Sequence, residues 1–308
     1  AGVQSKGLKS ANLAINGGTV MCYLSGGVVL ATNAVVTTNG TTVTTNRYVE
    51  PSYCTGIKCD SNLTVNAGTL TVTHVGLAGK GISTDKDITI NGGTLDLFTS
   101  GGSSAIFTNE LQAKDVAGAD CLKADGTLRI LGGTLRAVST GNAGDAISAE
   151  GDAIIGVLGV TNTPYIEAAT RGQKVLVSGS GNSADYSNPK TFSAQGNVTV
   201  NGGTFRATTQ NDGGEGLESK NVLTIHGGDL EITAYDDCIN AASNVVINGG
   251  KIYGYSTGND AIDSNGNMAI NGGTIVASGT MAPEEGFGFF PLRKSYQLPG
   301  RPGQSDGR

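Results

Sequence analysis

The stretch LTIHGGDLEI at 223–232 is followed by two variants of the same pattern, VVINGGKIYG at 245–254 and MAINGGTIVA at 268–277. In each, apolar and polar residues alternate, Gly-Gly interrupts the alternation, and the alternation then resumes. The residues before Gly-Gly are His226, Asn248 and Asn271, which are 22 and 23 residues apart. A repeat of this length, with the period of a strand and no helical periodicity, is typical of a β-solenoid in which each repeat forms one coil.

The same pattern can be followed along most of the chain. One long step is explained if residues 100–118 leave a single coil as an excursion. The sequence therefore predicts an all-β fold, a parallel β-helix (solenoid) of about eleven coils. The turn residues of these coils are Asn16, Asn39, Asn66, Asn91, Leu131, Gly156, Ser178, Asn201, His226, Asn248 and Asn271, with the poorest matches at Asn39, Gly156 and Ser178.

Alternation also predicts which side chains are buried. In ISTDKDITINGGTLDLF at 82–98, the aliphatic residues from Ile82 to Leu97 face the core, and Asp96 and Phe98 face outward. Stacking such coils builds aliphatic ladders inside a rod. We expect Gly-Gly to turn the chain with positive φ, and the asparagines before it to tolerate the left-handed conformation and to hydrogen-bond to one another from coil to coil.

Composition supports one elongated domain. The 308 residues include 49 glycines and no tryptophan, and only 15% are charged. We predict a single β-helix over residues 1–288 and a basic tail or linker over 289–308. A net charge of −6 argues against nucleic acid as a partner, and no apolar run is long enough to span a membrane. The five cysteines show no metal-binding spacing and are expected to be small buried hydrophobes.

Acidic residues recur near the first core aliphatic residue of the coils. Carboxylates stacked on adjacent coils repel each other unless something compensates, and Ca²⁺ is the usual oxygen-liganded cation. An alternative is that these acids lie at hydrated corners and cap turns. We predict structural Ca²⁺ at these corners, with as candidate ligands Glu215, Asp237, Asp260, Asp263, Asp145 and Glu285.

A second group of residues lies at outward positions of the strand after Gly-Gly. Aromatic faces pack on sugar rings, and arginine and glutamate hydrogen-bond to hydroxyl groups or uronic carboxylates. Strand spacing would give regular subsites for a long polymer, although any solenoid exposes some side chains on its outer face. The carbohydrate-binding candidates are Tyr253, Tyr255, Tyr235, Arg206, Arg136, Glu231 and Phe98.

Evidence for catalysis is weaker. The many carboxylates leave a glycosidase pair open by residue type, and a lyase would need a base such as Arg136 or Arg206. His74 and His226 occupy unrelated positions, and no nucleophile motif occurs. We therefore predict no enzymatic activity, with a polysaccharide lyase as the first alternative and a structural surface adhesin as the second.

The segments 214–266 and TIVASGTMAPEEGF at 274–287 resemble the bacterial carbohydrate-binding β-helix family, whose coils alternate a D-A-I or D-G-I corner with an ITINGGT turn. This resemblance implies a right-handed, pectate-lyase-like β-helix with surface calcium that binds plant cell-wall polysaccharide without catalysis. Related modules accompany xylan-degrading enzymes, so xylan is the favoured ligand, with a pectic or cellulosic chain possible. The resemblance also implies a secreted or cell-surface bacterial protein whose tail joins a glycoside hydrolase domain.

Overall fold

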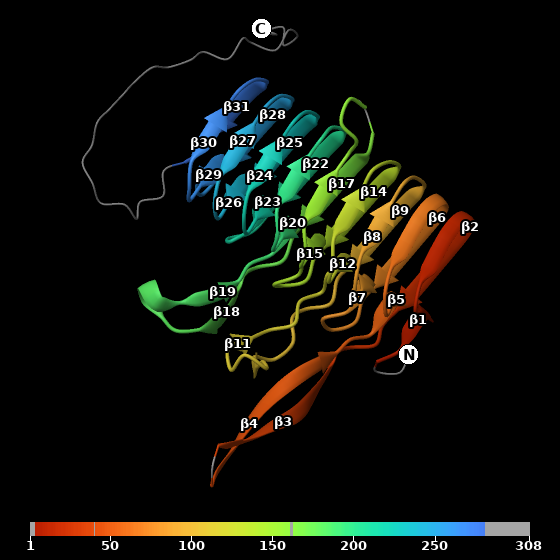
Figure 1. The fold of residues 1–308 in the computed structure, drawn as a ribbon, viewed down its shortest axis with the longest axis vertical. Coiled ribbons are helices and arrows are strands. Elements are labelled where there is room, and N and C mark those ends of the chain that lie inside the picture. The colour runs from red at the N-terminus through yellow and green to blue at the C-terminus, as the bar shows by residue number, and fades with distance from the viewer. Residues whose placement is uncertain (1–3, 40, 161–162, 281–308) are drawn as a thin grey trace, which may run out of the picture.

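The computed structural model describes residues 4–39, 41–160 and 163–280 (Figure 1). Within these residues the fold is all-β, with two long parallel sheets and no α-helix. Sheet A contains nine strands, in the order β1 (Lys6–Ser10), β5 (Thr55–Cys59), β7 (Lys80–Thr84), β12 (Leu122–Ala124), β15 (Ile147–Ala149), β20 (Lys190–Ala194), β23 (Glu215–Ser219), β26 (Ile239–Ala241) and β29 (Ile262–Ser264).

Sheet B contains 16 strands and receives both arms of each Gly-Gly turn. In β2 (Leu13–Leu24) and β6 (Leu63–His74) one strand runs through the turn. In later repeats the arm before the turn is a short strand: β8 (Ile88–Ile90), β13 (Leu128–Ile130), β16 (Ala153–Ile155), β21 (Val198–Val200), β24 (Leu223–Ile225), β27 (Val245–Ile247) and β30 (Met268–Ile270). The arm after the turn is longer: β9 (Thr94–Thr99), β14 (Thr134–Ser139), β17 (Tyr165–Thr170), β22 (Thr204–Thr209), β25 (Asp229–Ala234), β28 (Lys251–Ser256) and β31 (Thr274–Ser278).

Each described repeat thus contributes one strand to sheet A and a turn with two arms to sheet B. The turn contains Gly-Gly except in β6, where it is Ala67-Gly68, and between β16 and β17, where residues 156–164 form a longer connection. Successive repeats pair in parallel and in register, as where Ile88 pairs with Leu128 and Leu128 with Ala153. This arrangement is compatible with the predicted β-helix. The described residues contain nine repeats, so the expectation of about eleven was too high.

The two surplus turn positions lie in antiparallel hairpins that leave the stack. Asn39 ends β3 (Val29–Asn39), which pairs with β4 (Thr42–Ser52). Ser178 ends β18 (Val175–Ser178), which pairs with β19 (Asp185–Ser187) across the 3₁₀ turn η1 (Gly181–Ser183). Both hairpins alternate like solenoid strands, so alternation alone could not separate them from true repeats. Gly156, by contrast, follows β16 and has the positive φ of a true turn.

The predicted excursion at 100–118 is confirmed and carries a third hairpin, β10 (Phe107–Thr108) with β11 (Lys114–Asp115). All three hairpins project from the same side of the stack, away from the long strands of sheet B (Figure 1). They therefore form walls beside sheet A.

One continuous aliphatic core lies between the sheets. Ile82, Ile88, Ile90, Leu95 and Leu97 are buried as predicted, while Asp96 and Phe98 are exposed. In the last described repeat, Met268 and Ile270 are 43% and 59% exposed, because the described residues cover them on one side only. All five cysteines are free, and all but Cys22 are buried, as expected for small hydrophobes.

The turns follow a simpler rule than expected. The second glycine takes the positive φ, as at Gly93 (86°) and Gly250 (94°), whereas no turn asparagine in the described residues does so. Their amides do form the predicted ladder: Asn91 donates to Asn66 at 2.8 Å and Asn66 donates to Asn16 at 2.7 Å. The expectation of left-handed asparagines was therefore wrong, and the ladder was right.

Candidate functional site

The outer edge of sheet A carries a column of charged residues, one per repeat. Register places Lys6, Thr55 and Lys80 side by side, and Lys190 beside Glu215. Asp120 and Asp145 stand at the same position, two residues before the core residues Leu122 and Ile147, which pair with each other. The sequence already places Lys6, Thr55 and Lys80 at the acid position of the first repeats, and Lys190 adds a cation among the acids of the later repeats. In order, the column reads Lys6, Thr55, Lys80, Asp120, Asp145, Lys190, Glu215, Asp237 and Asp260.

Lys190 is the centre of the most buried charged cluster. Its Nζ lies 3.1 Å from Glu215 Oε1 and 2.7 Å from Glu218 Oε2, and Lys220 pairs with the other oxygen of Glu218. Burial raises the pKa of Glu215, and the neighbouring Lys190 only partly offsets this. Burial also disfavours the charged form of Glu218, but Lys190 and Lys220 bring its pKa below the usual value. The two glutamates thus differ in proton affinity although they share one lysine.

Asp145 extends this cluster toward the N-terminal repeats. Its Oδ1 accepts the Lys190 backbone N–H at 2.9 Å, and Ser193 Oγ lies 3.3 Å from its Oδ2. Burial, followed by the charge of Asp120, raises the pKa of Asp145 to about 7. Asp120 itself forms a buried ion pair with Lys80.

Whether Ca²⁺ can bind the predicted acidic ligands depends on the lysines that already contact them. No three His, Cys, Asp or Glu side chains of the described residues are grouped so that they could hold a metal ion. Lys190 already contacts Glu215 through its ammonium group and Asp145 through its backbone N–H, so a cation at these two predicted ligands would have to share them with Lys190. Glu285 lies outside the described residues.

The corner at Asp237, Asp260 and Asp263 differs, because no lysine or arginine of the described residues forms an ion pair with these three acids. Asp237 Oδ1 accepts the Asp260 backbone N–H at 3.1 Å. Burial, then the charge of Asp236, raises the pKa of Asp237 to about 7. A calcium ion takes six to eight oxygen ligands, and carboxylates alone do not supply them at this corner.

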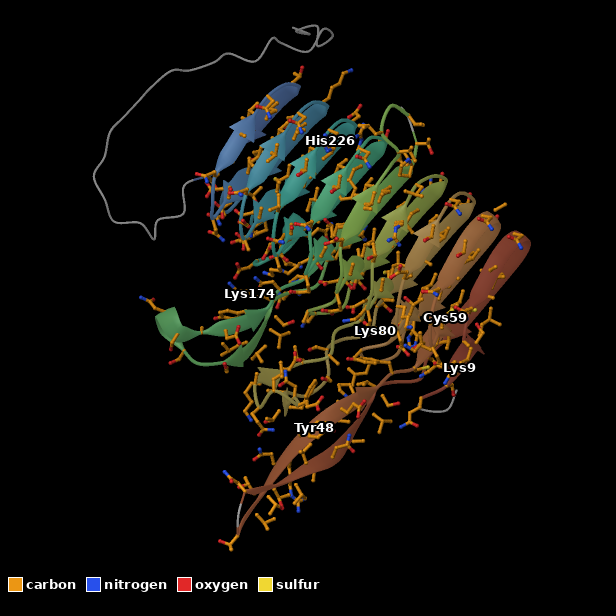
Figure 2. The ribbon with its side chains drawn as sticks, in the orientation of Figure 1. Lys9, Tyr48, Cys59, Lys80, Lys174 and His226 are labelled. Atoms are coloured by element: carbon orange, nitrogen blue, oxygen red, sulfur yellow. The ribbon has the colours of Figure 1, made fainter. Side chains whose placement is uncertain are left out.

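Three adjoining cavities lie along sheet A and the hairpins, and we call them together the hairpin groove. The central cavity, about 490 Å³, contains Lys80, Asp145, Lys190 and Glu215. It shares Tyr53, Lys80 and Lys123 with a cavity of about 400 Å³ at the base of the β3–β4 hairpin. It shares Tyr186 with a third, of about 570 Å³, beside the β18–β19 hairpin. Figure 2 labels Lys80 and Lys174 on this side of the stack.

The groove was not predicted from the sequence. Its central lysine, Lys190, stands eleven residues before the turn residue Asn201, the same distance that separates Glu215 from His226. It was missed because only acids were considered at this position of the later repeats. Its tyrosines come from the base of one hairpin and from a strand of another. No periodic signal marks such positions.

The predicted carbohydrate-binding residues lie mainly on the outer face of the long strands of sheet B. Register aligns Arg136, Glu167, Arg206, Glu231 and Tyr253 in one column. Phe98 and Tyr255 lie in the adjacent column, in register with Val138 and Thr233. The structure therefore brings most of the predicted residues to one face.

Charges on this face pair with one another. Arg136 Nε lies 3.3 Å from Glu167, and Arg206 contacts both Asp229 at 3.0 Å and Glu231 at 3.2 Å. Both arginines considered as lyase bases are thus engaged in ion pairs, and nothing in the geometry supports that alternative. Tyr253 and Tyr255 are 44% and 39% exposed on β28, and Tyr253 borders a shallow cavity of about 460 Å³ with Glu231 and Lys251.

Tyr235 is separated from these two tyrosines. It follows β25 at the corner of its repeat and lines the third cavity of the hairpin groove together with Tyr186. It therefore belongs with the groove.

The histidines offer no catalytic arrangement. His74 is buried, its Nδ1 accepts the Gly76 N–H at 3.1 Å, and burial lowers its pKa. His226 takes the place of a turn asparagine and contacts Asn248 at 3.2 Å (Figure 2). A cavity of about 600 Å³ beside this turn is lined by six glycines and by side chains that include Asn201, His226, Asp229 and Lys251.

Comparison with known proteins agrees with a role in carbohydrate binding. A family model described as "Carbohydrate-binding domain-containing protein" matches residues 62–163 and 167–258, more than half of the chain. Comparison with curated proteins and with solved structures finds no match. No helix among the described residues is long and apolar enough to cross a membrane. The chain belongs to the carbohydrate-binding domain-containing protein family.

Proposed function

We propose that this chain is a non-catalytic module that binds a plant cell-wall polysaccharide along the outer face of the long strands of sheet B. The observation that carries the proposal is the pair of exposed tyrosines, Tyr253 and Tyr255, beside Glu231 and Lys251. Tyrosine faces stack on sugar rings, and neighbouring charged groups hydrogen-bond to hydroxyls. Parallel strands about 4.8 Å apart repeat such contacts along the rod, which suits a polymer.

Ion pairing on this face favours an uncharged polymer. Arg136 and Arg206 already have carboxylate partners, so a polyuronate would have to displace those carboxylates. A neutral chain can instead donate hydroxyl hydrogens to the carboxylates and leave the ion pairs in place. Xylan or a cellulosic chain is therefore favoured over a pectic chain.

Affinity electrophoresis tests the proposal. The full chain is run through gels that contain xylan, hydroxyethyl cellulose, mixed-linkage glucan or polygalacturonate. We expect retardation on xylan, and a loss of about tenfold or more in affinity for Tyr253→Ala/Tyr255→Ala. Tyr48→Ala, on the β3–β4 hairpin, is the matched control. Equal retardation of the double variant and the parent would place binding elsewhere.

Calcium is a separate part of the proposal and concerns Asp237, Asp260 and Asp263. Support comes from the raised pKa of Asp237 and from the fact that these acids form no ion pair with a lysine or arginine among the residues that the structure describes. A higher melting temperature with calcium than with EDTA is the expected result, and identical melting curves would contradict it.

The remaining parts of the proposal concern architecture and setting. We propose that sheets A and B are sides of one right-handed β-helix, supported by the continuous core between them. We also propose secretion or surface display by a bacterium and a glycoside hydrolase joined through residues 289–308, in keeping with the binding of plant cell walls. A crystal structure tests the handedness, and the sequence encoded downstream tests the joined domain.

A further inference from the structure

The hairpin groove has features of a ligand site that the sheet B face does not share. Its three cavities, of about 490, 400 and 570 Å³, adjoin through shared residues. Each falls in the range of about 300–1,000 Å³ that is usual for small-molecule pockets. The walls are hairpins on one side and, on the other, buried charged residues of sheet A that include Lys80, Asp120 and Glu215.

Two tyrosines mark the junctions between these cavities. Tyr53 borders the first and central cavities, and Tyr186 borders the central and third. Each ring is held by a lysine whose ammonium lies 4.6 Å from the ring centre, Lys80 at Tyr53 and Lys174 at Tyr186. Such cation–π contacts hold each ring in place at its junction; Tyr53 also packs against the cluster of Ala78, Phe107 and Ala117.

Glu215 provides an independent sign of a missing partner. Its side chain is only 8% exposed, and it lines the central cavity. Its Oε1 is engaged by Lys190 and Asn188, yet its Oε2 has no hydrogen-bond partner among the described residues. A buried carboxylate oxygen without a donor is costly, and a ligand hydroxyl in the cavity would satisfy it.

Charge in the central cavity is close to balanced. Four lysines, Lys80, Lys123, Lys190 and Lys220, stand against five acids, Asp115, Asp120, Asp145, Glu150 and Glu215. A strongly anionic ligand would meet the acids, and a strongly cationic one the lysines. Donors and acceptors in alternation, between aromatic rings, suit a neutral ligand rich in hydroxyl groups.

We propose that the hairpin groove is a second saccharide site, which binds a neutral oligosaccharide between Tyr53 and Tyr186 with a sugar hydroxyl donating to Glu215 Oε2. This site is independent of the sheet B face, because the hairpins project from the side of the stack away from the long strands (Figure 1). Tyr235 extends it at the third cavity.

Titration calorimetry with xylohexaose, cellohexaose and trigalacturonate tests this site on the full chain. We expect the parent to bind a neutral hexaose at two sites, and Tyr253→Ala/Tyr255→Ala to retain one of them. Tyr186→Ala should weaken the retained site about tenfold, because a stacking face is lost. Glu215→Gln keeps the shape of the side chain and should weaken it about fivefold, because a charged acceptor becomes a neutral one.

Controls separate binding from folding. Tyr186 is 41% exposed on its hairpin, so Tyr186→Ala should melt like the parent, and Tyr48→Ala should bind like the parent. Unchanged affinity of Tyr186→Ala and Glu215→Gln would overturn the proposal, as would complete loss of binding in Tyr253→Ala/Tyr255→Ala. No heat with either neutral hexaose, or binding of trigalacturonate alone, would also overturn it. If the groove variants weaken binding while Tyr253→Ala/Tyr255→Ala does not, the result supports a saccharide site in the hairpin groove and contradicts the proposed site on the sheet B face.

Discussion

In the Gly-Gly turns and in the charged column of sheet A, residues at the same position of successive repeats lie on top of one another. The chemical consequences in the two places are opposite. At the turns, asparagine lies on asparagine, and each amide donates to the next, as Asn271 does to Asn248 at 2.8 Å. At the corners, acids and lysines are mixed, and the buried pairs are Lys80 with Asp120 and Lys190 with Glu215 and Glu218.

An amide group carries both a donor and an acceptor, so an asparagine row satisfies itself. An ionised carboxylate only accepts, and a second carboxylate beside it raises the free energy of both. A stack can therefore repeat asparagine without limit, whereas it must interrupt a row of acids with cations. Asp237 shows the cost where no lysine is present, because its pKa is raised to about 7 by burial first and then by Asp236.

Of the changes considered, removal of Lys190 should reduce the free energy of unfolding most. Lys190→Met leaves Glu215 and Glu218 buried without their shared cation, which typically costs about 3–5 kcal/mol of unfolding free energy. Urea unfolding at pH 7 measures the loss. Lys251→Met, an exposed lysine on β28, is the matched control and should change stability by less than about 0.5 kcal/mol. Equal stabilities of the two variants would show that the corner charges do not need compensation.

Much of the stack could be predicted from sequence because it depends on local, periodic signals. Alternation placed Ile82, Ile88 and Leu97 in the core, and Gly-Gly located the turns. The amide ladder followed from asparagines one repeat apart. These features share one physical cause: parallel pairing in register places equivalent residues of successive repeats next to one another.

What could not be predicted depends on the hairpins. Asn39 and Ser178 alternate as solenoid strands do but pair with antiparallel neighbours that no period reveals. Lys190 stands at the same distance before its turn residue, Asn201, as the acids of other repeats do before theirs, but only acids were considered at this position of the later repeats, so calcium was expected to compensate them. Tyr53 and Tyr186 meet the groove only because two hairpins far apart in sequence project from the same side. The site therefore depends on long-range geometry even though the scaffold does not.

Neutralising Asp237 should increase the free energy of unfolding, by less than removal of Lys190 decreases it. Its folded-state pKa of about 7 lies above the unfolded value of about 3.9, so the folded state holds its proton more tightly. As pH rises from about 4 to about 7, the unfolded state loses this proton first, and wild-type stability falls. Asp237→Asn removes that loss and keeps an acceptor for the Asp260 N–H. The full shift corresponds to about 4 kcal/mol. Because solvent screens part of it, we expect a gain of about 2 kcal/mol at pH 8 and none at pH 4.

Urea unfolding in EDTA at several pH values measures this difference without calcium. Asp96→Asn, an exposed acid on β9, is the control and should show no such trend. A constant difference between wild type and Asp237→Asn across pH 4–8 would contradict a raised pKa. Added calcium that stabilises wild type but not Asp237→Asn would assign an ion to this corner.

The amide ladder should give the smallest effect, and its size should follow position in the row. Asn66 donates to Asn16 and accepts from Asn91, whereas Asn91 ends this part of the row because Leu131 follows it. Asn66→Ala breaks two exposed hydrogen bonds and should cost about 1 kcal/mol; Asn91→Ala breaks one and should cost about half of that. Thermal unfolding of the two variants side by side measures the ratio. If both variants lose the same free energy of unfolding, the hydrogen bonds of the row do not contribute additively. Asparagine would then be favoured at this position by the backbone conformation of the turn. A loss in Asn66→Ala as large as that in Lys190→Met would remove the contrast between self-satisfied and compensated rows, because an amide would then be as hard to replace as a buried charge.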